Sequence, residues 1–410
     1  MNKRKIFNDP VYGFISIASD LLYDLISHPY FQRLRRIRQL GMAELVYPGA
    51  LHTRFHHALG AMHLMRQALE TLRAKGHLIW EAEWEAAQAA ILLHDVGHGP
   101  FSHVLEHTIM QQVPHEYLSL ALMKELNRQM DGRLDLAIQM FEGSYPRQFF
   151  HQLISSQLDM DRMDYLNRDC FFTGVAEGAI GTERIIKMLD VVDDQLVVEA
   201  KGILSIENFL NARRLMYWQV YLHKTSICAE AMLIQAIRRA RFLLQDGQHL
   251  YLPEALKLFL TDNISIERFE NEPKYLAAFT QLDDYDIWAC LKNWASHTDW
   301  VLSTICQRLL NRQLYKIQFS DQPLEDAQLE KYRTELHQQA IDDKHESYFL
   351  VTGQSSNAAY VSSKERILIK MKDGSVRDIA EASDLPTIKA LSNIVRKYYV
   401  CWAKPLTLQL

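Results

Sequence analysis

The histidines of this 410-residue chain gather in one short part of it. Ten of the 17 fall between His52 and His115. Solvent-exposed helix faces normally carry Lys, Glu and Arg, so such a cluster asks for a chemical explanation. Neutral imidazole ligates metal ions, and imidazolium pairs with phosphate. The cluster therefore predicts metal or phosphate chemistry in this part of the chain.

The pair His94-Asp95 follows an apolar stretch, residues 86–93, and precedes a glycine-rich turn. Neighbouring helical residues point about 100° apart, so both side chains reach one ion only if it sits off the helix end. A histidine on a facing helix and a distant carboxylate would complete the shell, and His57 and Asp161 are the candidates. This mixed N/O set suits Mn, Fe, Mg or Zn. A lone His-Asp pair can equally be a buried hydrogen-bonded couple.

The elements that must position these residues are mostly helices. Apolar residues at helical spacing predict helices over about 56–75 and 81–95, each closed by a glycine turn. Further helical patterns cover about 115–142, 146–155, 161–170, 182–190, 204–245 and 253–310. A hairpin is expected at 189–199 around Asp193-Asp194, and residues 1–29 look irregular.

The pattern changes near residue 313. Strands are expected at 314–319, 347–351, 367–372 and 398–402, with helices near 326–340 and 385–395 and a turn at Asp373-Gly374. The predicted fold is therefore mainly α. We expect a helical domain over residues 1–312 and a small C-terminal α+β domain over residues 313–410.

Composition excludes several classes of protein. Hydrophobic residues make up 48% and charged residues 23%, and the net charge is −5, so no strong basic field draws the chain to nucleic acid or membrane. No apolar run approaches the ~20 residues of a membrane span, and no apolar signal core follows the basic N-terminus. The five cysteines are far apart. We expect reduced thiols and a cytoplasmic protein.

Three stretches, residues 47–60, 94–103 and 161–170, resemble one known family. They are similar to the segments around the metal ligands of the HD-domain metal-dependent phosphohydrolases, especially the deoxynucleoside triphosphate (dNTP) triphosphohydrolases. The block 94–103 is a highly specific signal. The likeness is good over residues 3 to 245 and extends to the catalytic core of the mammalian members that carry a SAM module. It implies an HD-domain helical core that splits dNTPs into deoxynucleoside and triphosphate.

The resemblance also implies a role for individual residues. One divalent metal ion per subunit would be held by His57, His94, Asp95 and Asp161. The α-phosphate would be met by Arg54, His98, His103 and His115, with His103 transferring the proton and Glu106 holding that imidazole. Arg54 also lies three residues before His57, on the same helical face. His63, His77 and His107 are expected to serve packing or the surface.

Substrate contacts follow from the same resemblance. The γ-phosphate would meet Arg162, Tyr165 and Arg213, and Mg²⁺ could accompany the phosphates. Gln39 and Asp169 match the pair that reads the sugar 3′-hydroxyl. Tyr221 matches an aromatic residue that packs against C2′, which would leave no room for a ribose 2′-hydroxyl.

Two other functions remain open from the sequence. One is a different HD enzyme, a nucleotidase or phosphodiesterase, in which the extra histidines hold a second metal. The other is a nucleic-acid-binding regulatory module, supported by the arginine runs 33–38 and 238–241. The low basic content and the intact metal set favour the dNTP hydrolase.

Regulation is the remaining expectation. The family usually forms tetramers or hexamers, and mammalian members are switched on by nucleotides bound between subunits. Lys5, Gln32 and Arg35 match residues of their regulatory guanine site, whereas Ser27 stands where those members have Asp. A hydroxyl accepts fewer hydrogen bonds from guanine than a carboxylate does. We therefore expect that GTP is not an obligatory activator.

Overall fold

A two-stranded hairpin opens the part of the chain that the structure describes. This computed structural model describes residues 5–17, 19–110, 113–357, 360, 366–386, 388 and 395–405. Strands β1 (Lys5–Asp9) and β2 (Gly13–Ile17) pair antiparallel, so the expectation of an irregular N-terminus is wrong. The Asp9 carboxylate accepts hydrogen bonds from two turn amides, and Gly13 has the left-handed φ of +73° that the turn needs. Ile15 and Ile17 alternate into the core, a short period-two pattern.

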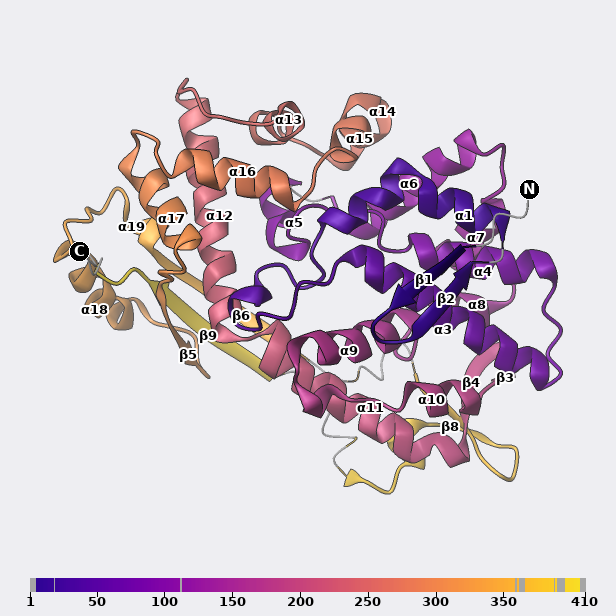
Figure 1. Ribbon diagram of the computed structural model, residues 1–410. Coiled ribbons are helices and arrows are strands. Elements are labelled where there is room, and N and C mark those ends of the chain that lie inside the picture. Colours follow the sequence, from indigo (N-terminus) through magenta and orange to yellow (C-terminus); the bar gives the residue numbers. More distant parts are fainter. Residues whose placement is uncertain are drawn as a thin grey trace.

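Three helices form the centre of the helical core (Figure 1). They are α3 (Arg54–Ala74), α4 (Glu81–Leu93) and α9 (Met160–Thr173), and α3 packs against both of the others. Alanines on α4 allow close approach, and residues 89–93 are wholly buried. Because α4 ends at Leu93, His94 and Asp95 stand just off its C-terminal end.

The remaining helices of the core surround this centre. In chain order they are α1 (Asp20–Ser27), α2 (Pro29–Gln32), α5 (His103–Ile109), α6 (His115–Gln129), α7 (Asp135–Glu142), α8 (Gln148–Ile154) and α10 (Thr182–Met188). The single helix expected over 115–142 is divided, because Asp131 and Gly132 take left-handed backbone angles.

A long helical passage leads out of the core and is interrupted once. It consists of α11 (Ile203–Met216), a π-helical turn (Tyr217–Tyr221) and α12 (Lys224–Gln245). In Figure 1, a second group of helices lies around the upper part of α12, on both sides of it. That group is α13 (Glu254–Thr261), α14 (Ile266–Asn271), α15 (Pro273–Phe279), α16 (Asp284–Trp294) and α17 (Trp300–Leu310).

The segment after residue 312 supplies strands to two separate sheets. One has the order β5-β9-β6, from β5 (Lys316–Ser320), β6 (Leu350–Asn357) and β9 (Val395–Trp402). The other has the order β3-β4-β7-β8, from β3 (Leu189–Val192), β4 (Gln195–Glu199), β7 (Leu368–Lys370) and β8 (Val376–Asp378). Since β7 pairs parallel with β4, late strands extend a hairpin of the helical part. The division at residue 312 stays a prediction.

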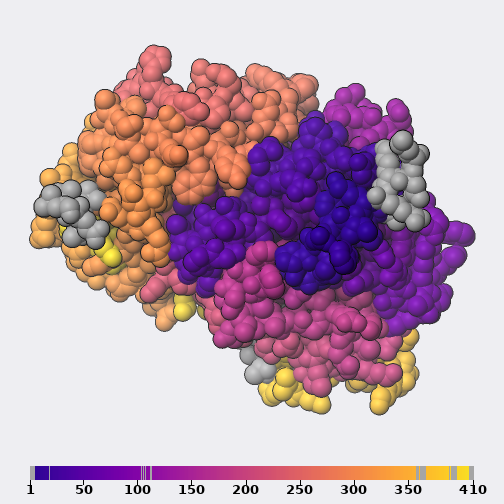
Figure 2. All heavy atoms as spheres, in the orientation of Figure 1, coloured from indigo at the N-terminus to yellow at the C-terminus, as the bar shows by residue number. Residues whose placement is uncertain are grey.

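Short helices complete this segment. They are α18 (Asp326–His337), α19 (Glu346–Phe349) and α20 (Ile379–Ala382). The strand expected at 347–351 is wrong in its first half, because α19 occupies residues 346–349 and β6 begins at Leu350. The helix expected at 385–395 lies largely outside the described residues. In Figure 2, yellow C-terminal atoms appear both under the magenta helices and beside the orange ones.

The expected mainly α fold is confirmed. All five cysteines are free thiols, as expected. Among the described residues, no helix is both long and apolar enough to cross a membrane.

Candidate active site

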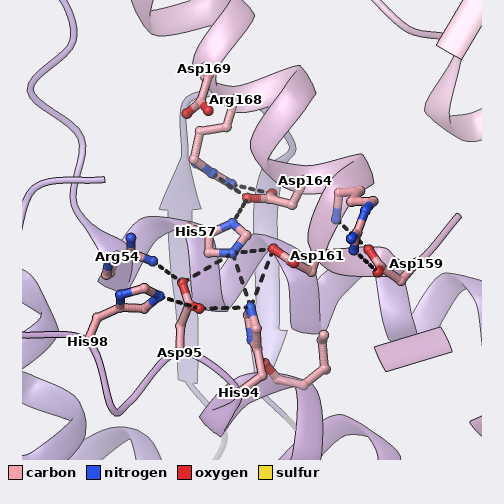
Figure 3. Close-up of polar contacts among 12 residues, drawn as sticks. Arg54, His57, His94, Asp95, His98, Asp159, Asp161, Asp164, Arg168 and Asp169 are labelled. Carbon is pink, nitrogen blue, oxygen red and sulfur yellow. Dashed lines mark hydrogen bonds and ion pairs between the residues drawn. The ribbon is translucent and has the colours of Figure 1, made fainter. Parts of the chain in front are cut away.

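Helices α3, α4 and α9 bring three predicted metal ligands together (Figure 3). His57 Nε2 lies 3.3 Å from His94 Nε2 and 3.1 Å from Asp161 Oδ1, and His94 Nε2 lies 3.4 Å from the same oxygen. Neighbouring donors around one ion with bonds of about 2.1 Å stand roughly 3.0–3.4 Å apart. The three atoms therefore have the spacing of a metal site.

Hydrogen bonds at the far side of each imidazole aim these nitrogens inward. His57 Nδ1 lies 2.7 Å from Asp164 Oδ2, and His94 Nδ1 lies 2.6 Å from the carbonyl oxygen of Ile91. Both acceptors favour a proton on Nδ1, which leaves Nε2 free to bind a cation. Arg168 in turn holds Asp164 and forms a buried ion pair with Asp9. The orientation of His57 thus depends on a buried chain of charges that reaches the N-terminal hairpin.

Asp95 lies at the edge of this group. Its Oδ1 is 3.4 Å from His94 Nε2, and its Oδ2 is 3.7 Å from His57 Nε2. The same carboxylate forms an ion pair with Arg54 and lies 3.2 Å from His98 Nε2. Asp95 is therefore placed to complete the set as a fourth ligand and to connect it to the phosphate-facing residues.

The electrostatics of the group suit a cation. Burial alone lowers the pKa of the His57 imidazole, but hydrogen bonds to Asp161 and Asp164 outweigh burial and raise that pKa to about 10. Burial acts to raise the pKa of Asp161, yet the contacts with His57 and His94 hold it well below its usual range. The carboxylates thus attract positive charge to this point, and a divalent ion would take the place of protons. The residues present fit a metal.

Most of the other predicted residues line one cavity of about 890 Å³. Its wall includes Gln39, Arg54, Asp95, His98, His115, Asp161, Arg162, Tyr165, Asp169 and Tyr221. His57 is wholly buried and adjoins this wall through Asp161 and Asp95.

The predicted sugar-reading residues form a connected cluster. The Tyr221 hydroxyl donates to Asp169 Oδ2 over 2.8 Å, and the other carboxylate oxygen lies 2.7 Å from His52 Nε2. The Gln39 backbone N–H donates to the His52 carbonyl oxygen, and the side-chain oxygen Oε1 of Gln39 is buried without a partner among the described residues. The π-helical turn presents Tyr221 to the cavity, and such turns are frequent at functional sites.

The three predicted γ-phosphate residues are placed differently from one another. Arg162 forms an ion pair with Asp159 at the start of α9, and Tyr165 packs edge-on against Tyr221 with ring centroids 5.9 Å apart. Arg213 is buried, is absent from the cavity wall and donates to Gln157 over 2.9 Å. Arg162 and Arg213 each keep a buried Nε without a partner within the described chain.

The predicted phosphate-facing histidines lie beside Asp95. His98 and His115 stack with ring centroids 4.0 Å apart. Burial, reinforced by Arg54, holds the pKa of His98 well below its usual range. Glu106 accepts a hydrogen bond from the His115 backbone amide and lies 3.2 Å from His115 Nδ1. The predicted contact of Glu106 with His103 involves a side chain outside those the structure describes.

The predicted regulatory residues come together on the surface near the hairpin. Arg35 donates to Gln32 Oε1 over 2.8 Å and stacks on the Phe55 ring at 3.5 Å. Lys5 Nζ lies 5.0 Å above the Phe7 ring, which packs against Phe55. Ser27 is exposed.

Several arginines of the two basic runs have structural partners. Arg33 is fully buried and donates to three backbone carbonyls. Arg36 forms an ion pair with Asp283, and Arg239 forms one with Asp299. These contacts give the three arginines structural roles. His77 likewise lies 2.6 Å from the Asp190 carboxylate, whereas the His107 side chain lies outside the described ones.

Sequence reasoning missed the far wall of the cavity. That wall includes Glu230, Gln235 and Arg238 of α12, Val351, Thr352, Gln354 and Ser355 of β6, and Tyr399 of β9. Nothing local in the sequence marks β6 or β9 as neighbours of the histidine cluster. Only the helical spacing of Glu230, Ile234 and Arg238 could have shown that these residues share one face.

Comparisons with known proteins agree with this geometry. The HD domain model matches residues 54–169, which hold all four predicted ligands, and the HD associated region matches residues 180–249. The uncharacterized protein YwfO of Bacillus subtilis is 32% identical over 406 residues, which cover 93% of this chain and 88% of that protein. The chain belongs to the HD-domain phosphohydrolase family.

Other members of this family extend the comparison. The crystal structure of a phosphohydrolase from Bacteroides thetaiotaomicron matches with a TM-score of 0.95 and 53% identity, over 98% of this chain and all of that one. Deoxynucleoside triphosphate triphosphohydrolase SAMHD1 of Homo sapiens is 28% identical over 324 residues, 66% of this chain and 51% of that protein. The family predicted from the sequence is confirmed.

Proposed function

We propose that this phosphohydrolase splits dNTPs into deoxynucleoside and inorganic triphosphate. The observation that carries the proposal is the cavity whose wall carries both Asp95 and Asp161 of the metal-type donor group and the Asp169–Tyr221 pair. One end suits a phosphate, and the other offers hydrogen-bonding groups and an aromatic ring for a sugar. The activity for which the SAMHD1 relatives are named supports the same substrate class.

His57, His94 and Asp161 would hold one divalent ion, with Asp95 as the fourth ligand. When bound, the ion would neutralise charge on the α-phosphate and polarise the bond to be broken. Mn, Mg, Fe and Zn all accept this N/O set. Arg54 would donate to a non-bridging phosphate oxygen while its ion pair with Asp95 keeps it in place.

The histidines near Asp95 would donate hydrogen bonds and transfer the proton during the reaction. Burial and Arg54 lower the pKa of His98 and so favour the neutral imidazole, which is suited to donate a hydrogen bond without adding charge. His115 is fixed by Glu106 and stacks on His98. We assign the proton that the departing 5′-oxygen requires to His103, as the family resemblance implies.

The residues around the sugar would select deoxyribose, and those around the terminal phosphates would determine which phosphate product leaves. The Tyr221 ring would occupy the space that a ribose 2′-hydroxyl needs, while its hydroxyl keeps Asp169 oriented toward the 3′-hydroxyl. Arg162 and Tyr165, which line the cavity, would bind the terminal phosphates without approaching the bond that breaks. Arg213, the third residue that the family resemblance implies, would have to turn from Gln157 to reach them. Triphosphate would therefore leave in one piece.

A second HD activity, on monophosphates or phosphodiesters, is favoured by one observation. Glu106, His115 and Glu116 form another group whose ligand atoms lie within 4.8 Å of one another. A second ion there would suit an enzyme with two metals. This group is more exposed than the first.

We further propose that the enzyme is a homo-oligomer, and that any nucleotide activator binds near Lys5, Gln32 and Arg35. Dependence on GTP is not expected, because Ser27 offers guanine a neutral hydroxyl. dNTP hydrolysis with and without GTP, at matched free metal, tests this point. A strict requirement for GTP would overturn it.

Product analysis tests the main proposal. Each of the four dNTPs and four NTPs is incubated with the protein and Mn²⁺ or Mg²⁺, and the products are separated by chromatography. Deoxynucleoside plus triphosphate is the expected result. Pyrophosphate plus dNMP, or single phosphates, would contradict it, and hydrolysis of monophosphates alone would favour the second activity.

A further inference from the structure

One carboxyl group in the far wall of the cavity is left without a partner by the protein. Glu230, on α12, lines the cavity together with Ile234 and Arg238 on the same helical face. Within the described residues, its carboxyl group makes no hydrogen bond and no ion pair. Its Oε1 lies 3.9 Å from the point where a Cβ on Gly41 would stand. Glu230 therefore faces the loop that begins with Gln39.

Burial of an uncompensated carboxylate is costly. Burial raises the pKa of Glu230 to about 8, and no neighbouring cation opposes that effect, so without a ligand the carboxyl group is largely protonated at pH 7. Two N–H donors from a ligand would favour the ionised form and lower that pKa again. A buried carboxyl group without a partner contributes most to binding free energy when a ligand brings hydrogen-bond donors to it. The other polar groups of this wall, including Gln354 and Ser355 on β6, extend the same surface.

The position of Glu230 relates it to the sugar residues. Gln39, which belongs to the Asp169–Tyr221 cluster through His52, is followed directly by Leu40 and Gly41, and both of these line the cavity. Tyr221 lies three residues before the start of α12, whose cavity-facing side continues through Ile227 to Glu230. A deoxyribose held at Asp169 and Tyr221 would therefore direct its base toward Glu230.

We propose that Glu230 recognises the nucleobase and selects guanine. This inference rests on the proposed function, which supplies the dNTP. Guanine has two N–H donors side by side, on N1 and N2, and they match the two oxygens of one carboxylate. Adenine, cytosine and thymine present alternating donors and acceptors on that edge. They can pair two-fold only with a protonated carboxyl group.

The experiment removes the proposed hydrogen bond in two ways, once by changing the base and once by changing Glu230. Values of kcat/KM are measured for dGTP and for dITP, which lacks only the N2 amino group, with dATP, dCTP and TTP for comparison. The variants are Glu230→Gln, which keeps the size but replaces one acceptor with a donor, and Glu254→Gln, which removes an exposed acidic charge on α13. Melting temperatures confirm that both variants are folded.

In the wild type we expect dGTP to exceed dITP by about one to two powers of ten, which corresponds to one charge-assisted hydrogen bond. In Glu230→Gln this ratio should fall to near one, and in Glu254→Gln it should stay at the wild-type value. Equal kcat/KM values for dGTP and dITP in the wild type would overturn the proposal. An unchanged ratio in Glu230→Gln would also overturn it.

A binding measurement separates this inference from the proposed function. Titration of the wild type and Glu230→Gln with deoxyguanosine and deoxyinosine needs no hydrolysis. Suppose that no dNTP is cleaved, but the wild type prefers deoxyguanosine and Glu230→Gln does not. This result would support guanine recognition by Glu230 and reject the proposed hydrolysis of dNTPs. If all dNTPs are cleaved at similar rates and the wild type binds both nucleosides equally, dNTP hydrolysis is supported and guanine recognition by Glu230 is rejected.

Discussion

Gly60 gives the sharpest test of how the metal ligands are held in position. It lies one helical turn after His57 on α3, against the buried pair of Asp164 and Arg168. A Cβ added at Gly60 would stand 2.0 Å from Asp164 Oδ1 and 2.2 Å from Arg168 Nη2. Gly60→Ala must therefore displace the carboxylate that hydrogen-bonds His57 Nδ1.

The expected effect is large for a single methyl group. Overpacking costs about 1–3 kcal/mol, whereas the gain in helix propensity from Gly to Ala is only about 1 kcal/mol. Loss of an outer partner of a metal-binding histidine lowers metal affinity or activity about 10- to 100-fold. We expect Gly60→Ala to be less stable and to bind metal at least about tenfold more weakly.

Metal titration and thermal unfolding measure both effects. Gly181→Ala is the matched control, because Gly181 has negative φ and a Cβ there meets nothing within 4 Å. The control should keep the metal affinity of the wild type, although Ala is a poorer N-cap than Gly and lowers stability slightly. If Gly60→Ala kept both the metal affinity and the stability of the wild type, His57 would not depend on Asp164 as argued.

The remaining predictions concern the ligands, the sugar and the acid in the cavity. His94→Ala combined with Asp95→Ala should abolish metal binding and activity but keep the helical circular dichroism; equal metal content in variant and wild type would reject the assignment. Tyr221→Ala should raise activity on NTPs relative to dNTPs, and an unchanged ratio would locate sugar selection elsewhere. Tyr221→Phe loses the hydrogen bond to Asp169 and should lower kcat/KM about tenfold, with wild-type kinetics as the contrary result. Because its folded-state pKa is raised to about 8, Glu230 favours the folded state less as pH rises from about 5 to 8. Denaturant unfolding at about pH 5 and about pH 8 should show that the wild type loses more unfolding free energy between the two pH values than Glu230→Gln does. Equal losses in the two proteins would contradict this prediction.

The centre of the site was predictable because its signals are local. Apolar spacing places α3, α4 and α9 close to their observed bounds, and each predicted donor of the metal group sits at or near an end of one of these helices. The structure then brings His57, His94 and Asp161 together. Their roles as ligands stay a prediction until metal is measured.

The remainder depends on contacts between distant segments. The parallel pairing of β4 with β7 joins strands more than 150 residues apart, and no local pattern specifies it. The approach of Tyr399 to the cavity is equally non-local. Glu230 stands in a helix whose other side is apolar, so in the sequence it resembles an ordinary solvent-facing acid. Its isolation is visible only when the surrounding elements are in place.

The most direct test of the central claim is the identity of the phosphate product. Metal-loaded protein is incubated with dGTP, and the products are separated by anion-exchange chromatography with triphosphate, pyrophosphate and phosphate standards. Deoxyguanosine and triphosphate should appear in equal amounts, with no dGMP. Release of dGMP with pyrophosphate, or no cleavage of dGTP with any of Mn²⁺, Mg²⁺, Fe²⁺ or Zn²⁺, would contradict the assignment.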